Sequence, residues 1–211
     1  MPFDGGNWQV TCKIGNTCTG RRPEGLASLA MCDGSLGARF AQMAHLEAAS
    51  VPAFRRLERE LRTLDAPRAL VLAARDAARD EIRHARTMAT FARKHGRRPE
   101  RVAHAPFRAR TLLELAIENA VEGCVRETLG AAQALAESVS AQDGDWRAAM
   151  ASVAEDEVRH AELAHAVDAW ARSRLDANSI AVLDRVQREA ARALPPSPLA
   201  HALGMELGWL A

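Results

Sequence analysis

The most constraining feature of the chain is a hexapeptide that occurs twice. Residues 80–85 read DEIRHA, and residues 156–161 read DEVRHA, an offset of 76 residues (156 − 80 = 76). In an α-helix, a Glu and a His three positions apart lie on one face, about one turn from each other. Each Glu-x-x-His pair can therefore share a metal ion. Two nearly identical copies, each within a helical pattern, indicate an internal duplication.

The duplication predicts further metal ligands. If the helices that carry the hexapeptides are equivalent, the helices that precede them should each supply one acid at a similar offset. Glu47 and Glu122 meet this condition, 75 residues apart (122 − 47 = 75), and both lie among small or apolar residues. The predicted ligands are therefore Glu47, Glu81, His84, Glu122, Glu157 and His160.

Two alternatives to this ligand set stay open at the sequence level. Glu118 and Glu127 flank Glu122, and either could be an additional or substitute ligand. The acids and histidines could also be solvated or could form surface salt bridges, with Arg83 and Arg159 as partners of the two hexapeptides.

Composition and periodicity favour an all-α fold. The 211 residues include 44 Ala, 26 Arg and no Tyr, and 48% are hydrophobic, enough for a sizeable core. Residues 1–35 carry many glycines and three cysteines, which predicts an irregular N-terminal arm. Helical periodicity then predicts long helices over about 35–64, 67–95, 111–142 and 146–175, followed by a fifth over about 179–194.

The connections between these helices predict a topology. Short links join the first helix to the second and the third to the fourth, whereas residues 96–109 form a longer crossover. This order is typical of a ferritin-like four-helix bundle with one crossover connection. We expect the bundle over 36–175, with a C-terminal helix and tail over 176–211.

Charge and hydropathy exclude several classes of function. Lys+Arg number 28 and Asp+Glu 27, which leaves no basic surplus for nucleic acid. No apolar run is long enough for a membrane span, and residues 1–10 do not resemble a signal peptide, so we expect a cytoplasmic protein. The absence of tyrosine excludes any mechanism that needs a tyrosyl radical or a tyrosinate ligand.

The cysteines do not form a recognisable zinc motif. Cys12, Cys18 and Cys32 lack the usual ligand spacing, and no histidine lies among them. Whether two of these three form a disulfide stays open. Cys124 is two residues from Glu122 and is expected to face away from it as a packed thiol.

The ligand pattern resembles that of the ferritin-like di-iron or di-manganese carboxylate proteins, such as bacterioferritin, rubrerythrin and the bacterial multicomponent monooxygenases. The resemblance covers about residues 36–172. The stretches 45–54 and 122–128 are also similar to a group of bacterial ferritin-like domain proteins. The resemblance to the di-iron or di-manganese proteins implies two bound Fe ions, with Mn as the alternative. It also implies that Asp80 accepts a hydrogen bond from His160, and Asp156 one from His84.

Three functions fit this pattern. The first is a non-haem di-iron oxidase or oxygenase that uses O2 or peroxide with an unidentified substrate or electron donor. The second is an iron-binding ferroxidase that stores or detoxifies iron. The third is a structural helix bundle in which the metal only stabilises the fold. We expect a monomer or small homo-oligomer, because an arm docked on the bundle would obstruct the packing of a ferritin cage.

Overall fold

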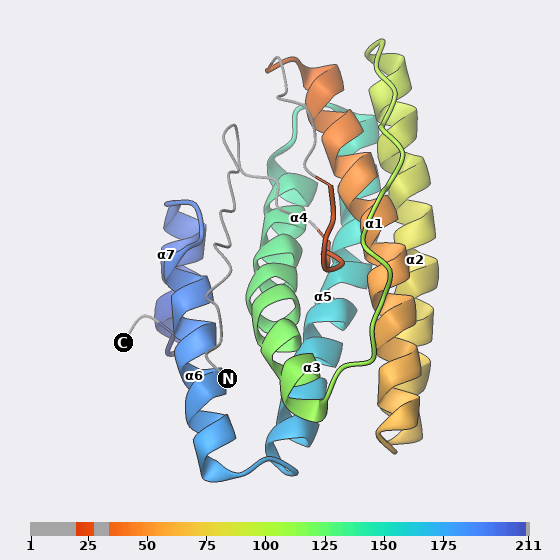
Figure 1. Cartoon of the computed structure of the whole chain (residues 1–211). Coiled ribbons are helices and arrows are strands. Elements are labelled where there is room, and N and C mark those ends of the chain that lie inside the picture. Colours follow the sequence, from red (N-terminus) through yellow and green to blue (C-terminus); the bar gives the residue numbers. More distant parts are fainter. Residues whose placement is uncertain (1–19, 28–33, 210–211) are drawn as a thin grey trace.

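The computed structural model describes residues 20–27 and 34–209, and its regular structure is helical, with no strand among these residues (Figure 1). This confirms the all-α prediction. The helical elements are α1 (Leu36–Thr63), α2 (Arg68–Lys94), α3 (Leu112–Glu118), the π-helix η1 (Asn119–Glu127), α4 (Thr128–Ser140), α5 (Gly144–Arg172), α6 (Ala177–Arg192) and α7 (Pro198–Glu206).

Four helical rods stand side by side in the molecule (Figure 1). In chain order they are α1, α2, the continuous run of α3, η1 and α4, and α5. α1 packs along α2, α4 packs along α5, and α2 and α5 are also in contact. α6 packs against η1 and α3, and α7 against α4. The third rod corresponds to the single helix expected over 111–142, but its middle is a π-helix.

Side-chain caps fix where several of these helices begin. The hydroxyl of Ser35 accepts a hydrogen bond from the amide of Ala38 at the start of α1. Thr111 forms a capping box with Glu114 before α3, and Asp143 accepts from the amide of Trp146 before α5. Such caps satisfy amides that have no partner within the helix. Side-chain caps thus mark the start of α1, α3 and α5, whereas α2 begins after Pro67 without one.

The long crossover runs along α1 without forming a helix of its own (Figure 1). His45 Nδ1 lies 3.1 Å from the carbonyl oxygen of Glu100, and Arg56 donates to the carbonyl of Arg108 at 2.8 Å. These bonds attach the crossover to one face of α1. It joins the end of α2 to the start of α3 and so links the pair of α1 and α2 to the second pair of rods, α3–η1–α4 and α5.

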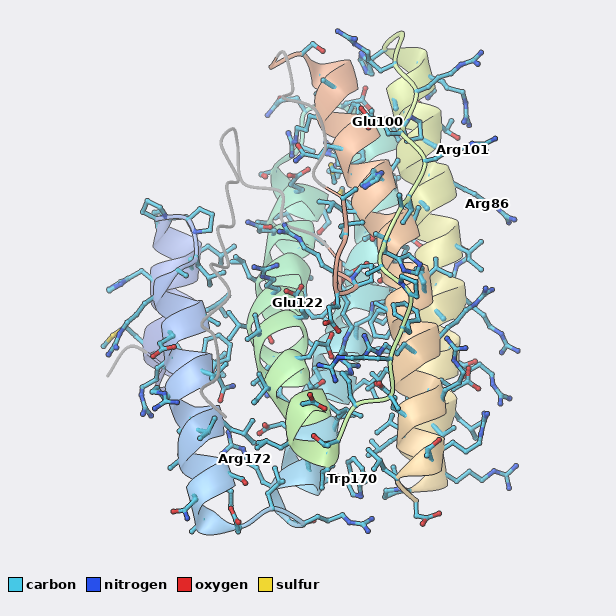
Figure 2. The ribbon with its side chains drawn as sticks, viewed as in Figure 1. Arg86, Glu100, Arg101, Glu122, Trp170 and Arg172 are labelled. Carbon is cyan, nitrogen blue, oxygen red and sulfur yellow. The ribbon has the colours of Figure 1, made fainter. Side chains whose placement is uncertain are left out.

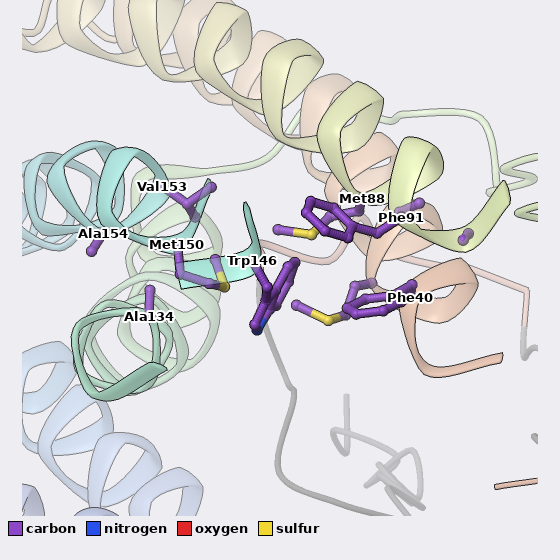
Figure 3. Packing of buried hydrophobic residues seen from close by; sticks show 11 residues of the cluster. Phe40, Met88, Phe91, Ala134, Trp146, Met150, Val153 and Ala154 are labelled. Carbon is purple, nitrogen blue, oxygen red and sulfur yellow. The ribbon is translucent and has the colours of Figure 1, made fainter. Parts of the chain in front are cut away.

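Two of the four apolar clusters among the described residues are large. One contains Phe40, Phe91 and Trp146, whose ring centroids are 4.8 to 5.3 Å apart (Figure 3). The other is built around Phe54 and Leu115, together with apolar residues of α1, α2 and α5. On each of α1, α2 and α5, the segment between these two clusters carries buried glutamate or histidine. The core therefore encloses a polar layer.

An N-terminal segment, residues 20–27, lies against the bundle of rods and contains no helix. We call it the strap. It lies between α1 and the third rod (Figure 1). Trp8, Cys12, Cys18 and Cys32 lie outside the described residues, and so does the open question of a disulfide among these cysteines. No helix within 20–27 or 34–209 has both the length and the apolar character needed to cross a membrane.

Candidate metal centre

Two groups of buried acids and histidine lie at the centre of the molecule. Glu47, Glu81, His84 and Glu157 form one, and Glu81, Glu127, Glu157 and His160 form the other. Within each group, one ligand atom from every residue lies within 4.8 Å of the others. Glu81 and Glu157 belong to both groups. The arrangement is thus two adjacent groups that could each hold a metal ion and that share two carboxylates.

The imidazoles approach this centre in the same way from opposite sides. His84 Nδ1 lies 3.2 Å from Glu157 Oε1 and 3.8 Å from Glu47 Oε2. His160 Nδ1 lies 3.3 Å from Glu81 Oε1 and 3.8 Å from Glu127 Oε2. Each histidine thus faces the shared glutamate of the opposite hexapeptide and the glutamate of a preceding helix. This pseudo-symmetry agrees with the duplicated sequence.

The carboxylates of the centre are buried without hydrogen-bond partners. Glu47, Glu81, Glu127 and Glu157 are all 0% exposed. All eight of their carboxylate oxygens, and the Nδ1 atoms of both histidines, lack a hydrogen bond. Leaving such groups unpaired is costly, whereas a bound cation would give each of them a ligand role. Carboxylate oxygens with two imidazoles suit iron or manganese. The residues therefore fit a two-metal centre.

An aspartate lies beside the Nε2 atom of each imidazole, on the side away from the glutamates. His84 Nε2 lies 2.9 Å from Asp156 Oδ2, and His160 Nε2 lies 3.5 Å from Asp80 Oδ2. The first contact is the hydrogen bond that the family resemblance implied for Asp156. For Asp80 the structure shows only proximity, because His160 Nε2 has no hydrogen bond. A carboxylate at Nε2 favours the tautomer whose Nδ1 is free to bind a metal.

Two arginines bridge the same aspartates. Arg83 pairs with Asp80 at 2.6 Å and with Asp156 at 2.7 Å, and Arg159 also pairs with both. The arginines of the hexapeptides thus bind the aspartates, not the glutamates beside the histidines. They link α2 to α5 over one face of the centre.

The buried acids and histidines of the centre shift one another's pKa values. Burial raises the pKa of Glu47, and it raises those of Glu81 and Glu127 well above the ordinary value, with neighbouring carboxylates adding to the effect. Burial would lower the pKa of His84, but the adjacent carboxylates of Glu157 and Glu47 raise it to about 9. Burial would also raise the pKa of Glu157, but His84 and His160 lower it. Proton binding is thus favoured at Glu47, Glu81 and Glu127 when no metal neutralises them.

The structure corrects the expected ligand set at one position. It brings together Glu47, Glu81, His84, Glu157 and His160, but Glu122 is not among them. Glu122 Oε1 lies 2.9 Å from Arg126 NH1, and Glu122 Oε2 accepts from the amide of Arg22 at 3.1 Å (Figure 2). Glu127 takes the place that was expected for Glu122. Glu118 is also outside the centre, paired with Arg21 and Arg110.

Distance from the interhelical turn agrees with the position of Glu127, and not Glu122, in the centre. Glu127 is 13 residues from the end of α4 at Ser140, and Glu157 is 13 residues from the start of α5 at Gly144. The two carboxylates therefore meet at the same height in the hairpin. Glu122 is five residues further from the turn, about 7.5 Å along a helix. The same count is unequal for α1 and α2, with 16 residues from Glu47 to Thr63 and 13 from Arg68 to Glu81, so the count alone does not select Glu127 from the sequence.

The π-helix also changes which side of the rod each acid faces. Gly123 packs closely on α5, since a Cβ at this position would lie 2.9 Å from that of Ala164. Asn119 donates to the carbonyl of Ala164 at 2.8 Å, and Cys124 lies against the same carbonyl as a buried free thiol. Residues 119–127 are wound with i→i+5 bonds, so α-helical spacing does not hold there.

Comparisons with known proteins identify no relative, because no family model, curated protein or solved structure matches the chain.

Proposed function

We propose that the chain is a ferritin-like four-helix bundle with a di-iron or di-manganese centre, and that it acts as a non-haem oxidoreductase on O2 or peroxide. The single observation that carries this proposal is the pair of buried Glu and His groups that share Glu81 and Glu157. Two adjacent cation sites with common carboxylates favour chemistry that uses two metals together. Two iron ions bound there would supply two electrons to a small oxidant.

The chain's own residues would bind and orient this centre. Four carboxylates would balance the charge of two divalent ions, and Glu81 and Glu157, which belong to both groups, would contribute to both sites. His84 and His160 complete the two sites, and Asp156 and Asp80 orient their rings. The apolar clusters on either side exclude water, which strengthens every charge interaction inside.

Metal analysis with activity measurements tests the proposal. The apo protein is loaded with Fe(II) without oxygen, and bound iron per chain and the rate of O2 or peroxide consumption are measured. We expect two iron ions per chain and consumption that depends on them. Glu157→Gln should lose the paired site, whereas Glu155→Gln, a change two residues away at an exposed position, should keep it.

The result also separates catalysis from storage. Binding of one iron ion or none at saturation would contradict a two-metal centre. Uptake of many iron atoms per chain, in a particle of a dozen or more subunits by light scattering, would favour ferroxidase and storage.

A further inference from the structure

The strap lies directly over the candidate metal centre. Gly20 has a φ of +86°, and a Cβ at this position would lie 3.6 Å from Glu47 Oε2 and 2.3 Å from Ser50 Oγ. A side chain larger than hydrogen therefore does not fit. The backbone at Gly20 occupies the space beside a carboxylate of the centre, on the side of the molecule where α1 and η1 face each other (Figure 1).

The next residue attaches the strap to the third rod. Arg21 is 1% exposed, and its guanidinium binds Glu118 with two hydrogen bonds, of 2.9 and 2.7 Å. It also donates to Asn119 Oδ1 at 3.2 Å and lies over the ring of Phe54, which in turn packs against His160. A buried arginine with two charge-assisted bonds gives both energy and a fixed geometry.

Further contacts extend the attachment along the strap. The amide of Arg22 donates to Glu122, and the amide of Ala27 donates to the carbonyl of Ala103 at 2.9 Å. Glu24 pairs with Arg56 at 3.3 Å. The two acids that lie near the centre without belonging to it, Glu118 and Glu122, are thus both used to hold the strap.

The other sides of the centre are covered as well. Asp80, Asp156, Arg83 and Arg159 cover the side between α2 and α5, and the two apolar clusters close the ends. An open hollow of about 520 Å³ lies between α1, α2 and the crossover, beside Arg86, Glu100 and Arg101 (Figure 2). It is lined by none of the six residues of the centre.

We propose that the strap restricts the metal centre to substrates the size of O2 or peroxide and excludes organic molecules. Arg21 binds the strap to the third rod, and the absence of a side chain at Gly20 lets its backbone lie against the centre. This inference rests on the proposed function and defines its substrate class. Electrons from any larger donor must then reach the metals without direct contact, because the donor cannot reach the ligands past the strap.

Cobalt substitution tests the size limit with two anions. Co(II) bound to Glu and His ligands absorbs visible light, and its spectrum changes when an anion reaches the metal. We expect azide, with three atoms, to change the spectrum of the wild-type protein, and benzoate not to. In Gly20→Ala, the displaced strap should let benzoate bind at least about tenfold more tightly than in the wild type.

Gly34→Ala is the matched control. Gly34 also has a positive φ, of +76°, but a Cβ there would meet nothing within 4 Å. The backbone strain is therefore similar, and only the contact with the centre differs. Benzoate should remain excluded in this variant. A benzoate-dependent spectrum in the wild-type protein, or equal benzoate affinity in the two glycine variants, would overturn the proposal.

Trypsin digestion gives a second readout that needs no metal. The Arg21–Arg22 bond should resist cleavage in the wild type because Arg21 is buried, and proline at 23 prevents cleavage after Arg22. Both Gly20→Ala and Arg21→Gln should be cut there about tenfold faster. Glu118 keeps Arg110 as a partner in Arg21→Gln, at 3.2 Å, so this variant leaves no isolated acid.

The outcomes distinguish the two proposals. Failure to bind cobalt would overturn the metal centre, and trypsin would still decide whether the strap is docked. If the wild-type protein binds cobalt but is cleaved rapidly at Arg21, the proposed metal centre is retained, and the proposal that the strap covers it is overturned. Circular dichroism of each variant checks that it remains folded.

Discussion

Glu122 and Glu127 are five residues apart on one rod but have different surroundings. Glu122 is compensated by Arg126 and by the amide of Arg22, so it is satisfied without a metal. Both oxygens of Glu127 are buried without a hydrogen bond. At the scale of single residues, it is this lack of partners that separates a candidate ligand from a structural acid.

The contrast gives a paired substitution test. Glu127→Gln removes a charged ligand from one of the two cation sites, so we expect the affinity for the second metal to fall at least about 100-fold. Glu122→Gln should retain two metals per chain. Titration of the apo variants with Co(II) measures both. Loss of metal in Glu122→Gln with retention in Glu127→Gln would show that the π-helical register is wrong.

The aspartates behind the histidines give a second test at this scale. Asp156 accepts from His84 Nε2, and Asp156→Asn would remove the charge that favours this tautomer. Metal affinity should fall about 10- to 100-fold. Asp76→Asn changes an aspartate on α2 that is 62% exposed and paired with Arg79, and it should have no effect. Equal affinities in all three proteins would mean that Asp156 does not orient the ligand.

At the scale of helices, sequence predicted most of what the structure shows. Helical periodicity placed the long helices to within a few residues. The hexapeptides placed Glu81, His84, Glu157 and His160, because a local repeat keeps its helical register. The π-helix could not be predicted in this way, because it depends on contacts that are distant in sequence. Cys124, for example, contacts the carbonyl of Ala164, which is 40 residues away.

The close contact of η1 with α5 can be tested at Gly123. Alanine would normally favour a helix over glycine, but a Cβ here would lie 2.7 Å from Asn119 Oδ1 and 2.9 Å from the Cβ of Ala164. We expect Gly123→Ala to lower the free energy of unfolding by about 1–3 kcal/mol and to weaken metal binding by moving Glu127. Urea unfolding and Co(II) titration measure these effects.

Gly144→Ala is the control for this substitution. Gly144 is the first residue of α5, and a Cβ there would meet only the end of Arg147, at 3.9 Å. This variant should be as stable as the wild type or more stable. If Gly123→Ala is also neutral and binds two metals, close packing at Gly123 does not maintain the register of η1.

At the scale of the whole molecule, the apolar clusters and the polar layer between them have opposite effects. Phe40, Trp146 and Phe54 are nearly or fully buried and stabilise the fold. Four buried carboxylates oppose it unless protons or cations neutralise them. Metal binding to the folded state alone would therefore contribute directly to stability.

This balance makes the stability of the apo protein depend on pH. The pKa of His84 is raised from 6.5 to about 9, so its stabilising effect is complete below pH 6.5 and is lost as pH rises through 9. Glu81 and Glu127 also have raised pKa values, so the folded state retains protons that the unfolded chain releases. These groups act in the same direction, and the apo protein should lose stability between pH 6.5 and 9.

Thermal melting of the apo and metal-loaded forms across this range measures the effect. The apo Tm should fall as pH rises, by about 2–4 °C for each kcal/mol lost in a chain of this size. The loaded form should change less, because bound metals replace the protons on the carboxylates and leave His84 neutral. The difference between the two Tm values should therefore widen from pH 6.5 to 9. Parallel curves, or equal Tm values at every pH, would mean that the four acids are solvated and that no cation is needed at the centre.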